Sequence, residues 1–140
     1  RADVAAVAQQ LRHALDDALA TVTWVAGFDF PDLTVDHELL ALTGDRIADY
    51  RQDVKACALG QAAASVVGGA VIGTTRDQVA TARAELEAML KRGGPAPSAP
   101  FHGLEVLMPA RDYANRHASI LLALDATLEA FDAARAAQSA

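Results

Sequence analysis

The feature that most constrains this chain is the run AAASVVGGAVI over residues 62–72, in which every side chain is small or apolar. A run without a polar face is typical of a helix that is buried all round. Gly68 and Gly69 weaken such a helix by roughly 1 kcal/mol each relative to alanine, so close backbone packing must compensate. The rest of the chain must therefore supply elements that surround this segment.

The composition decides what kind of core can do so. The 140 residues are 52% hydrophobic but only 5% aromatic. A chain of this length supports one domain with one core, and we expect a single domain over residues 1–140. Because aromatic side chains are scarce, Ala, Val and Leu must fill the core, which suits closely packed helices.

Charge and cysteine content exclude several partners. The net charge is -6 and the Lys and Arg residues are scattered, which argues against binding to nucleic acid. The longest uncharged stretch, residues 56–75, is interrupted by glycines and polar residues, so no membrane span is expected. The single cysteine, Cys57, cannot form an intramolecular disulfide, and a reducing cytoplasmic location is expected. Since the chain begins at Arg1 rather than Met, a preceding targeting segment stays an open alternative.

Residue periodicity predicts the elements of the first half. Apolar residues at helical spacing predict an amphipathic helix over about residues 2–20, within an N-terminal segment that reaches residue 26. A loop and a β-hairpin follow over residues 27–57. The loop ends at Leu33, and the hairpin turns at residues 43–45, where Thr-Gly-Asp interrupts the alternation.

Helices and a linker account for the second half. Two helices are predicted over residues 58–92, and Thr75 with Gln78 forms a capping-box signature at the start of the second. The Gly- and Pro-rich stretch and a short apolar turn make a surface linker and turn over residues 93–109, after which Pro109 resets the chain. A C-terminal helix occupies residues 110–140, regular from about Tyr113.

These elements predict an α+β fold. A small antiparallel sheet of two or three strands should pack against several helices, with the helix after Cys57 and the last helix on one face. Two strands alone would be marginally stable, so a third strand near residues 27–33 or a helical cover is required. His117 shares an apolar stripe with Ile120 and Leu124, and it should point inward.

One segment resembles a known family. Residues 56–65, ACALGQAAAS, are similar to the segment around the central cysteine of NifU-like and IscU-like iron-sulfur cluster scaffold proteins. A hairpin that leads into a cysteine at the start of a small-residue helix is also the order of that family. Pro109-Ala110-Arg111 stands where the family has Pro-Ala-Arg before its third cysteine and last helix. The resemblance covers roughly residues 31–131 and implies a NifU-like fold.

The resemblance also implies positions for a ligand set, of which Cys57 is the one cysteine retained. The third cysteine of the family corresponds to the segment Arg116-His117-Ala118, where His117 is the best match. For the first ligand, the turn at Thr43-Gly44-Asp45 mimics the motif but lies too near Cys57 for two intervening strands. Asp32 leaves room for the hairpin and fits better.

This set predicts cofactor binding by Cys57 and His117 and metal binding by Cys57, His117 and Asp32. A thiolate, an imidazole and a carboxylate are competent ligands for Zn²⁺ or Fe²⁺. The cofactor would be an iron-sulfur cluster or zinc, or none, and because clusters favour thiolates, stable assembly on one subunit is disfavoured. A homo-oligomer could complete the site across an interface.

Structural interpretations compete at each position. Cys57 could be a small buried hydrophobe, His117 a hydrogen-bonded core residue, and Asp32 a turn carboxylate. We expect no catalytic residue and no enzyme. The preferred hypothesis is a divergent iron-sulfur cluster assembly scaffold or sulfur/metal acceptor, whose partner by resemblance is a cysteine desulfurase or a recipient apoprotein. The alternatives are a degenerate scaffold fold acting as a protein-interaction module and a zinc-dependent sulfur-transfer protein.

Overall fold

The computed structural model describes the backbone of residues 22–30 and 33–138, and the side chains of residues 40–52 and 56–136. The helix predicted over residues 2–20 lies outside the described residues. The described elements, in chain order, are β1 (Val22–Phe30), β2 (Leu33–Thr43), β3 (Arg46–Lys55), α2 (Ala58–Ala70), α3 (Arg76–Arg92), the 3-10 helices η1 (His102–Asp112) and η2 (Ala114–Arg116), and α4 (His117–Gln138).

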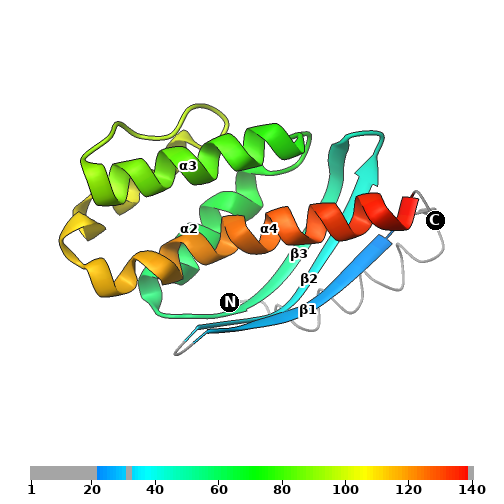
Figure 1. Cartoon of the computed structure of the whole chain (residues 1–140), viewed down its shortest axis with the longest axis horizontal. Coiled ribbons are helices and arrows are strands. Elements are labelled where there is room, and N and C mark those ends of the chain that lie inside the picture. Colours follow the sequence, from blue (N-terminus) through cyan, green and yellow to red (C-terminus); the bar gives the residue numbers. More distant parts are fainter. Residues whose placement is uncertain (1–21, 31–32, 139–140) are drawn as a thin grey trace.

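The three strands form one antiparallel sheet in the order β1-β2-β3 (Figure 1). The hairpin between β2 and β3 has the predicted turn, and Gly44 adopts a left-handed φ of 62° there, which costs glycine no steric penalty. The strand pairing continues from Thr43 opposite Arg46 to Thr34 opposite Lys55. The predicted α+β fold class is therefore confirmed.

Strand β1 corrects the prediction for residues 22–30. The sequence analysis extended the N-terminal helical segment to residue 26 and assigned residues 27–33 to a loop, with a third strand there as one of two ways to complete the sheet. The third strand exists, but it begins earlier and spans Val22–Phe30. The segment VTWVAGFDF alternates apolar residues with a period of two. In the sequence, Gly27 indicated a break in a helix. In the structure it lies within β1, and the residues on either side of it, Ala26 and Phe28, pair with β2.

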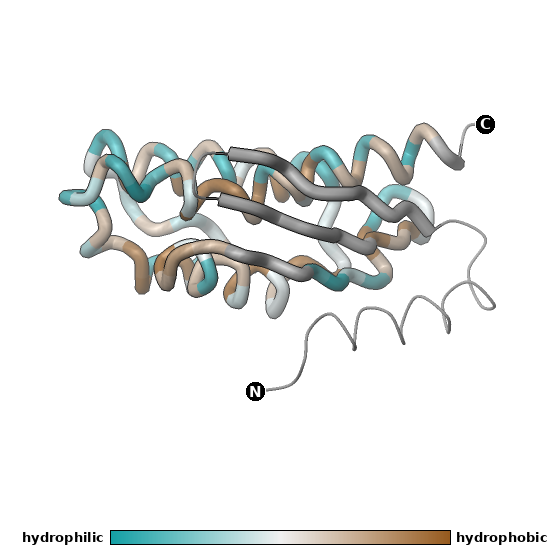
Figure 2. Tube along the Cα trace, turned by 90° about the horizontal axis from the view of Figure 1, so that it is seen from below, coloured by the Kyte–Doolittle hydropathy of each residue, from teal (hydrophilic) through white to brown (hydrophobic). Residues whose placement is uncertain are grey.

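Helices cover the sheet in layers. α4 contacts β1 and β2, and α2 contacts β3 and α4, while α3 packs on α4 and η1 (Figure 1). The view from below shows hydrophobic and hydrophilic residues alternating along the helices, as expected of helices with one buried and one exposed face (Figure 2). A buried polar contact joins the layers, since the Tyr50 hydroxyl on β3 lies 2.9 Å from Thr127 Oγ1 on α4. Within the described residues, no helix has the length and apolarity that crossing a membrane would require.

The helix after Cys57 departs from the prediction of burial all round. It ends at Ala70 rather than continuing to Ile72, and Ile72 is 52% exposed. Ser65 and Gly69 are exposed too, so α2 buries one face and not every face. Small side chains allowed burial without requiring it. The segment that is buried at every successive position is residues 119–124 of α4.

The stretch predicted as a surface linker is partly packed. Pro97 is buried and Ala96 packs against the core. Ser98 is held to α3, because its backbone N–H and its hydroxyl both donate to the carboxylate of Glu85. Proline and alanine are compact and apolar, so an irregular segment made of them can lie against a core as well as in solvent.

The chain after this stretch also differs from the prediction. Instead of a short apolar turn that Pro109 ends, η1 runs from His102 to Asp112 with Pro109 inside it. Every third residue is buried there, at Leu104, Leu107 and Ala110, as the threefold repeat of a 3-10 helix requires. The last α-helix therefore begins at His117 rather than near Tyr113.

The capping box of α3 gives a test of the fold. Thr75 Oγ1 accepts from the Gln78 backbone N–H, and Gln78 Oε1 accepts from the Thr75 backbone N–H. We expect Thr75→Ala to lower the free energy of unfolding by about 1 kcal/mol, because a helix N–H loses its acceptor. Thr81→Ala, at an exposed position of the same helix, is the matched control and should change stability by less than about 0.5 kcal/mol. Urea unfolding measures both, and equal losses would contradict the assignment.

Candidate functional site

Cys57 stands at the start of α2, as the sequence predicted. It is the N-cap residue, with extended backbone angles of φ -64° and ψ 169°, and its side chain is a half-buried free thiol. The N-terminus of a helix carries a partial positive charge and unpaired backbone N–H groups, both of which stabilise a thiolate. The backbone of this helix therefore favours the reactive form of the sulfur.

The contacts of the sulfur determine its ionisation. Burial of the thiol raises its pKa, but the hydrogen bond with the Ser119 hydroxyl and the nearby backbone N–H groups of Gly60 and Leu59 lower it. The positive charge of Arg116 lowers it further. The favourable interactions win, so the pKa of Cys57 lies below its ordinary value and a larger fraction of the thiol is ionised at neutral pH.

Ser119 on α4 is the side chain that the fold brings to the sulfur. Its Oγ lies 3.2 Å from Cys57 Sγ, and the residue is only 3% exposed. A thiolate has no proton to give, so the serine hydroxyl donates to the ionised sulfur. Sequence reasoning missed this residue. The available signal was its place in an apolar segment without charges, where a serine must be buried and must find a partner.

Gly60 allows α4 to approach α2 closely enough for Ser119 to reach the sulfur of Cys57. A Cβ atom at Gly60 would collide with Ser119 Oγ and would lie 2.8 Å from the Cβ of Ala56. The Ser119 carbonyl oxygen would be 3.1 Å away. Glycine is therefore required at position 60 by the close approach of the neighbouring helix. Gly69 differs, because a Cβ atom added there would meet nothing within 4 Å.

His117 points inward as predicted, and it is 6% exposed. Its Nε2 atom lies 3.0 Å from the carbonyl oxygen of Ala110, which can only accept, so Nε2 carries the proton. In the neutral ring, Nδ1 keeps the lone pair. Residues two apart on a helix point in different directions, so His117 contacts η1 while Ser119 contacts Cys57.

The remaining predicted ligand, Asp32, lies outside the described residues. Among the side chains that the structure describes, no three His, Cys, Asp or Glu residues gather as a metal-binding group. The structure thus brings Cys57 together with Ser119 and directs His117 to Ala110.

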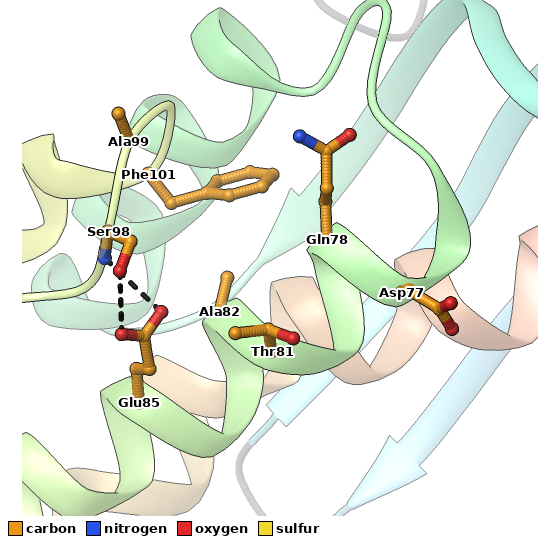
Figure 3. A pocket seen from close by; sticks show the side chains of 8 residues that line it. All are labelled: Asp77, Gln78, Thr81, Ala82, Glu85, Ser98, Ala99 and Phe101. Carbon is orange, nitrogen blue, oxygen red and sulfur yellow. Dashed lines mark hydrogen bonds between the residues drawn. The ribbon is translucent and has the colours of Figure 1, made fainter.

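A separate pocket of about 190 Å³ opens beside α3. Figure 3 shows the ring of Phe101 across it, with Gln78 and Ala82 on α3 and with Glu85 turned toward Ser98. Both carboxylate oxygens of Glu85 are engaged by Ser98. None of the residues that line the pocket is a cysteine or a histidine, so neither Cys57 nor His117 belongs to it.

Comparisons with solved structures identify similar proteins. The chain is 39% identical to the N-terminal part of a nitrogen-fixing NifU-like protein from Brucella abortus, with a TM-score of 0.74, covering 79% of this chain and 78% of that chain. It shares its fold, at 22% identity and a TM-score of 0.59, with a protein of Fervidobacterium islandicum assigned as an iron-sulfur cluster assembly scaffold of the SUF system, covering 81% of this chain and 80% of that chain.

A third structure, of a hypothetical protein, is 22% identical with a TM-score of 0.65, covering 83% of both chains. At that identity the likeness concerns the fold alone. No protein-family model and no curated protein matches the sequence.

The two glycines of α2 give a matched test of the site. We expect Gly60→Ala to lower the free energy of unfolding by roughly 1–3 kcal/mol, because overpacking against Ser119 outweighs the gain in helix propensity. Gly69→Ala should raise it by up to about 1 kcal/mol, because the new methyl group meets nothing. Chemical denaturation measures both changes. If the two variants shift stability in the same direction, the close approach at Gly60 is refuted.

Proposed function

Since this chain belongs to the NifU-like family of iron-sulfur cluster scaffold proteins, we propose that it serves cluster assembly as a sulfur acceptor and that Cys57 is the accepting residue. The observation that carries the proposal is the environment of the Cys57 sulfur. The thiol is half-buried, stands at a helix N-terminus and has a lowered pKa. Such a thiol is nucleophilic at neutral pH and still reachable.

The transfer needs no reagent beyond a persulfide donor. The Cys57 thiolate attacks the terminal sulfur of the donor persulfide, R–S–SH, and a new sulfur–sulfur bond forms at Sγ. The bond within the donor breaks, and its electron pair leaves on the donor thiolate, R–S⁻. The proton stays with the transferred sulfur, which is now carried as a Cys57 persulfide. By family resemblance, the donor is a cysteine desulfurase and the recipient is an apoprotein.

Metal or cluster binding at Cys57 with His117, and with Asp32 as a further ligand, is the competing proposal. One feature supports it, because imidazoles that bind metals commonly donate their other N–H to a backbone carbonyl, as His117 does to Ala110. Another weakens it, since the sequence offers a single thiolate and clusters are held by several. A second subunit would have to supply the rest.

A non-catalytic interaction module is the third candidate. It is favoured by the loss of all but one cysteine from a fold whose relatives include a cluster assembly scaffold. In that case Cys57 would serve packing, and the surface around it would only contact other proteins.

Sulfur uptake tests the preferred function. Incubation with a cysteine desulfurase and free cysteine should increase the mass of the native chain by one sulfur atom, as read by intact-mass spectrometry, and reduction should reverse the increase. Cys57→Ser should show no uptake. As a control for location, Cys57→Ser combined with Ser65→Cys places a thiol at an exposed position of the same helix. Equal uptake by that variant would show that the Cys57 environment is irrelevant.

Metal content separates the competing proposals. Native protein, Cys57→Ala and His117→Ala are exposed anaerobically to iron and sulfide or to zinc, and bound metal is measured after desalting. The metal proposal expects binding by the native chain that both substitutions abolish. The sulfur-acceptor proposal expects sulfur uptake that survives in His117→Ala, because the sulfur is hydrogen-bonded to Ser119 whereas His117 Nε2 is hydrogen-bonded to Ala110. Absence of both activities would leave the interaction module.

A further inference from the structure

A side chain of β3 donates a hydrogen bond into the middle of α2. The side-chain amide of Gln52, which is half-buried, donates to the carbonyl oxygen of Ala64. A carbonyl inside an α-helix already accepts from the N–H four residues later, so it needs no second donor. The bond from Gln52 is therefore not required to pair the backbone of α2. Its effect is to tie the helix to the strand.

Gly68 leaves the space that this amide occupies. A Cβ atom at Gly68 would lie 3.1 Å from Gln52 Nε2, which is closer than side chains ordinarily pack. In the sequence, a glycine at this position indicated a weakened helix. The structure gives a reason for it, because the amide of Gln52 lies against the helix at this point.

The oxygen of the same amide is held as well. The hydroxyl of Tyr50, a residue that is 4% exposed, lies 3.1 Å from Gln52 Oε1 and 2.9 Å from Thr127 Oγ1. Thr127 donates its own proton to the carbonyl oxygen of Ala123. The oxygens of Gln52 and Thr127 therefore share the proton of Tyr50. Polar contacts run without a break from α2 through β3 to α4.

The two helices that this network joins also form the candidate site. Ala64 lies seven positions after Cys57, about two turns along α2. Ala123 lies four positions after Ser119, about one turn along α4. Small apolar side chains interlock weakly, whereas a fully bonded polar network specifies one arrangement of the elements that it joins. The residues that α2 buries are mostly small, namely Gly60, Ala63, Ala64 and Val67.

We infer that Gln52 is a positioning residue, whose amide fixes α2 against α4 and so keeps the Cys57 sulfur beside Ser119. The inference rests on the proposed function, because sulfur transfer is what the placement would serve. Neither a metal nor the protonation state of the thiol enters it.

Nuclear magnetic resonance tests the placement directly. Gln52→Met keeps the approximate volume of the side chain and removes the donor to Ala64. We expect residual dipolar couplings of the backbone N–H groups to show α2 turned relative to α4, and the nuclear Overhauser contacts between Cys57 and Ser119 to weaken. Thr75→Ala, which destabilises the start of α3 instead, is the control and should leave both readouts as in native protein. An unchanged placement of α2 in Gln52→Met overturns the inference.

Tyr50→Phe is a second variant, which keeps the inference testable if Gln52→Met does not fold. It keeps the aromatic ring and removes the hydroxyl that holds Gln52 Oε1. We expect a smaller displacement of α2 than in Gln52→Met, because the amide keeps its bond to Ala64. Circular dichroism identifies the variants that fold. If none of them shows a displacement, the inference is overturned.

Sulfur uptake separates the inference from the proposed function. A misplacement of about 1 Å can slow a reaction by as much as about a hundredfold, so we expect Gln52→Met to take up sulfur on the order of tenfold more slowly than native protein and Thr75→Ala. If native protein takes no sulfur, the proposed function fails, and the role of Gln52 in transfer fails with it. If native protein takes sulfur and Gln52→Met matches its rate, the inference alone fails.

Discussion

The close packing of α2 against α4 is the interaction on which the rest of this structure depends. Both helices present small residues to each other and to the sheet, and the buried alanines include Ala63, Ala64, Ala123 and Ala130. Small side chains let helix backbones approach closely, and a chain with few aromatic residues has little else to fill a core. The same approach brings Ser119 against Cys57, so the packing that forms the core also builds the candidate site.

Because the packing of α2 against α4 also forms the candidate site, the site needs few residues beyond those of the two helices. Cys57 is the N-cap residue of α2, whose nearby backbone N–H groups favour the thiolate, and α4 supplies the Ser119 hydroxyl that hydrogen-bonds to the sulfur. The thiol environment is set by how two helices end and cross rather than by a dedicated loop. The bidentate ion pair between Arg76 and Asp132 and the contact of Arg83 with Asp125 tie α3 to α4 from the other side. Those pairs are partly exposed and each contributes little stability, so apolar packing holds the arrangement.

Local signals predicted the parts of the fold that depend on nearby residues. The hairpin turn at Gly44 and the capping box at Thr75 are written in a few adjacent side chains, and the position of Cys57 followed from the change of pattern after β3. The start and extent of strand β1 were predicted wrongly because its partner strand, not its own sequence, decides whether Gly27 interrupts an element. Burial of α2 was overestimated because small residues fit a core and a surface equally well.

The candidate site was only half predictable for a related reason. The thiol and the inward imidazole could be read from helix periodicity, but the partner of the thiol lies far along the chain and is known only once α2 and α4 are packed. Periodicity treated residues 119–124 as one apolar stripe plus neighbours, whereas the structure buries all of them. A serine in such a segment has no solvent to bond with, which turns an unremarkable residue into the best-placed polar group beside Cys57.

The protein groups around the Cys57 sulfur indicate which chemistry suits the site. Hydrogen-bond donors near a cysteine sulfur stabilise its thiolate, whether that thiolate is free or bound to a metal. Here the Ser119 hydroxyl lies 3.2 Å from the sulfur, and the backbone N–H groups at the start of α2 and the exposed Arg116 add positive charge near it. Such surroundings stabilise the anionic sulfur that the proposed transfer requires. They add no second thiolate that would keep a cluster in place. The balance of these groups favours a sulfur that is charged, presented and handed on over one that is held in lasting coordination.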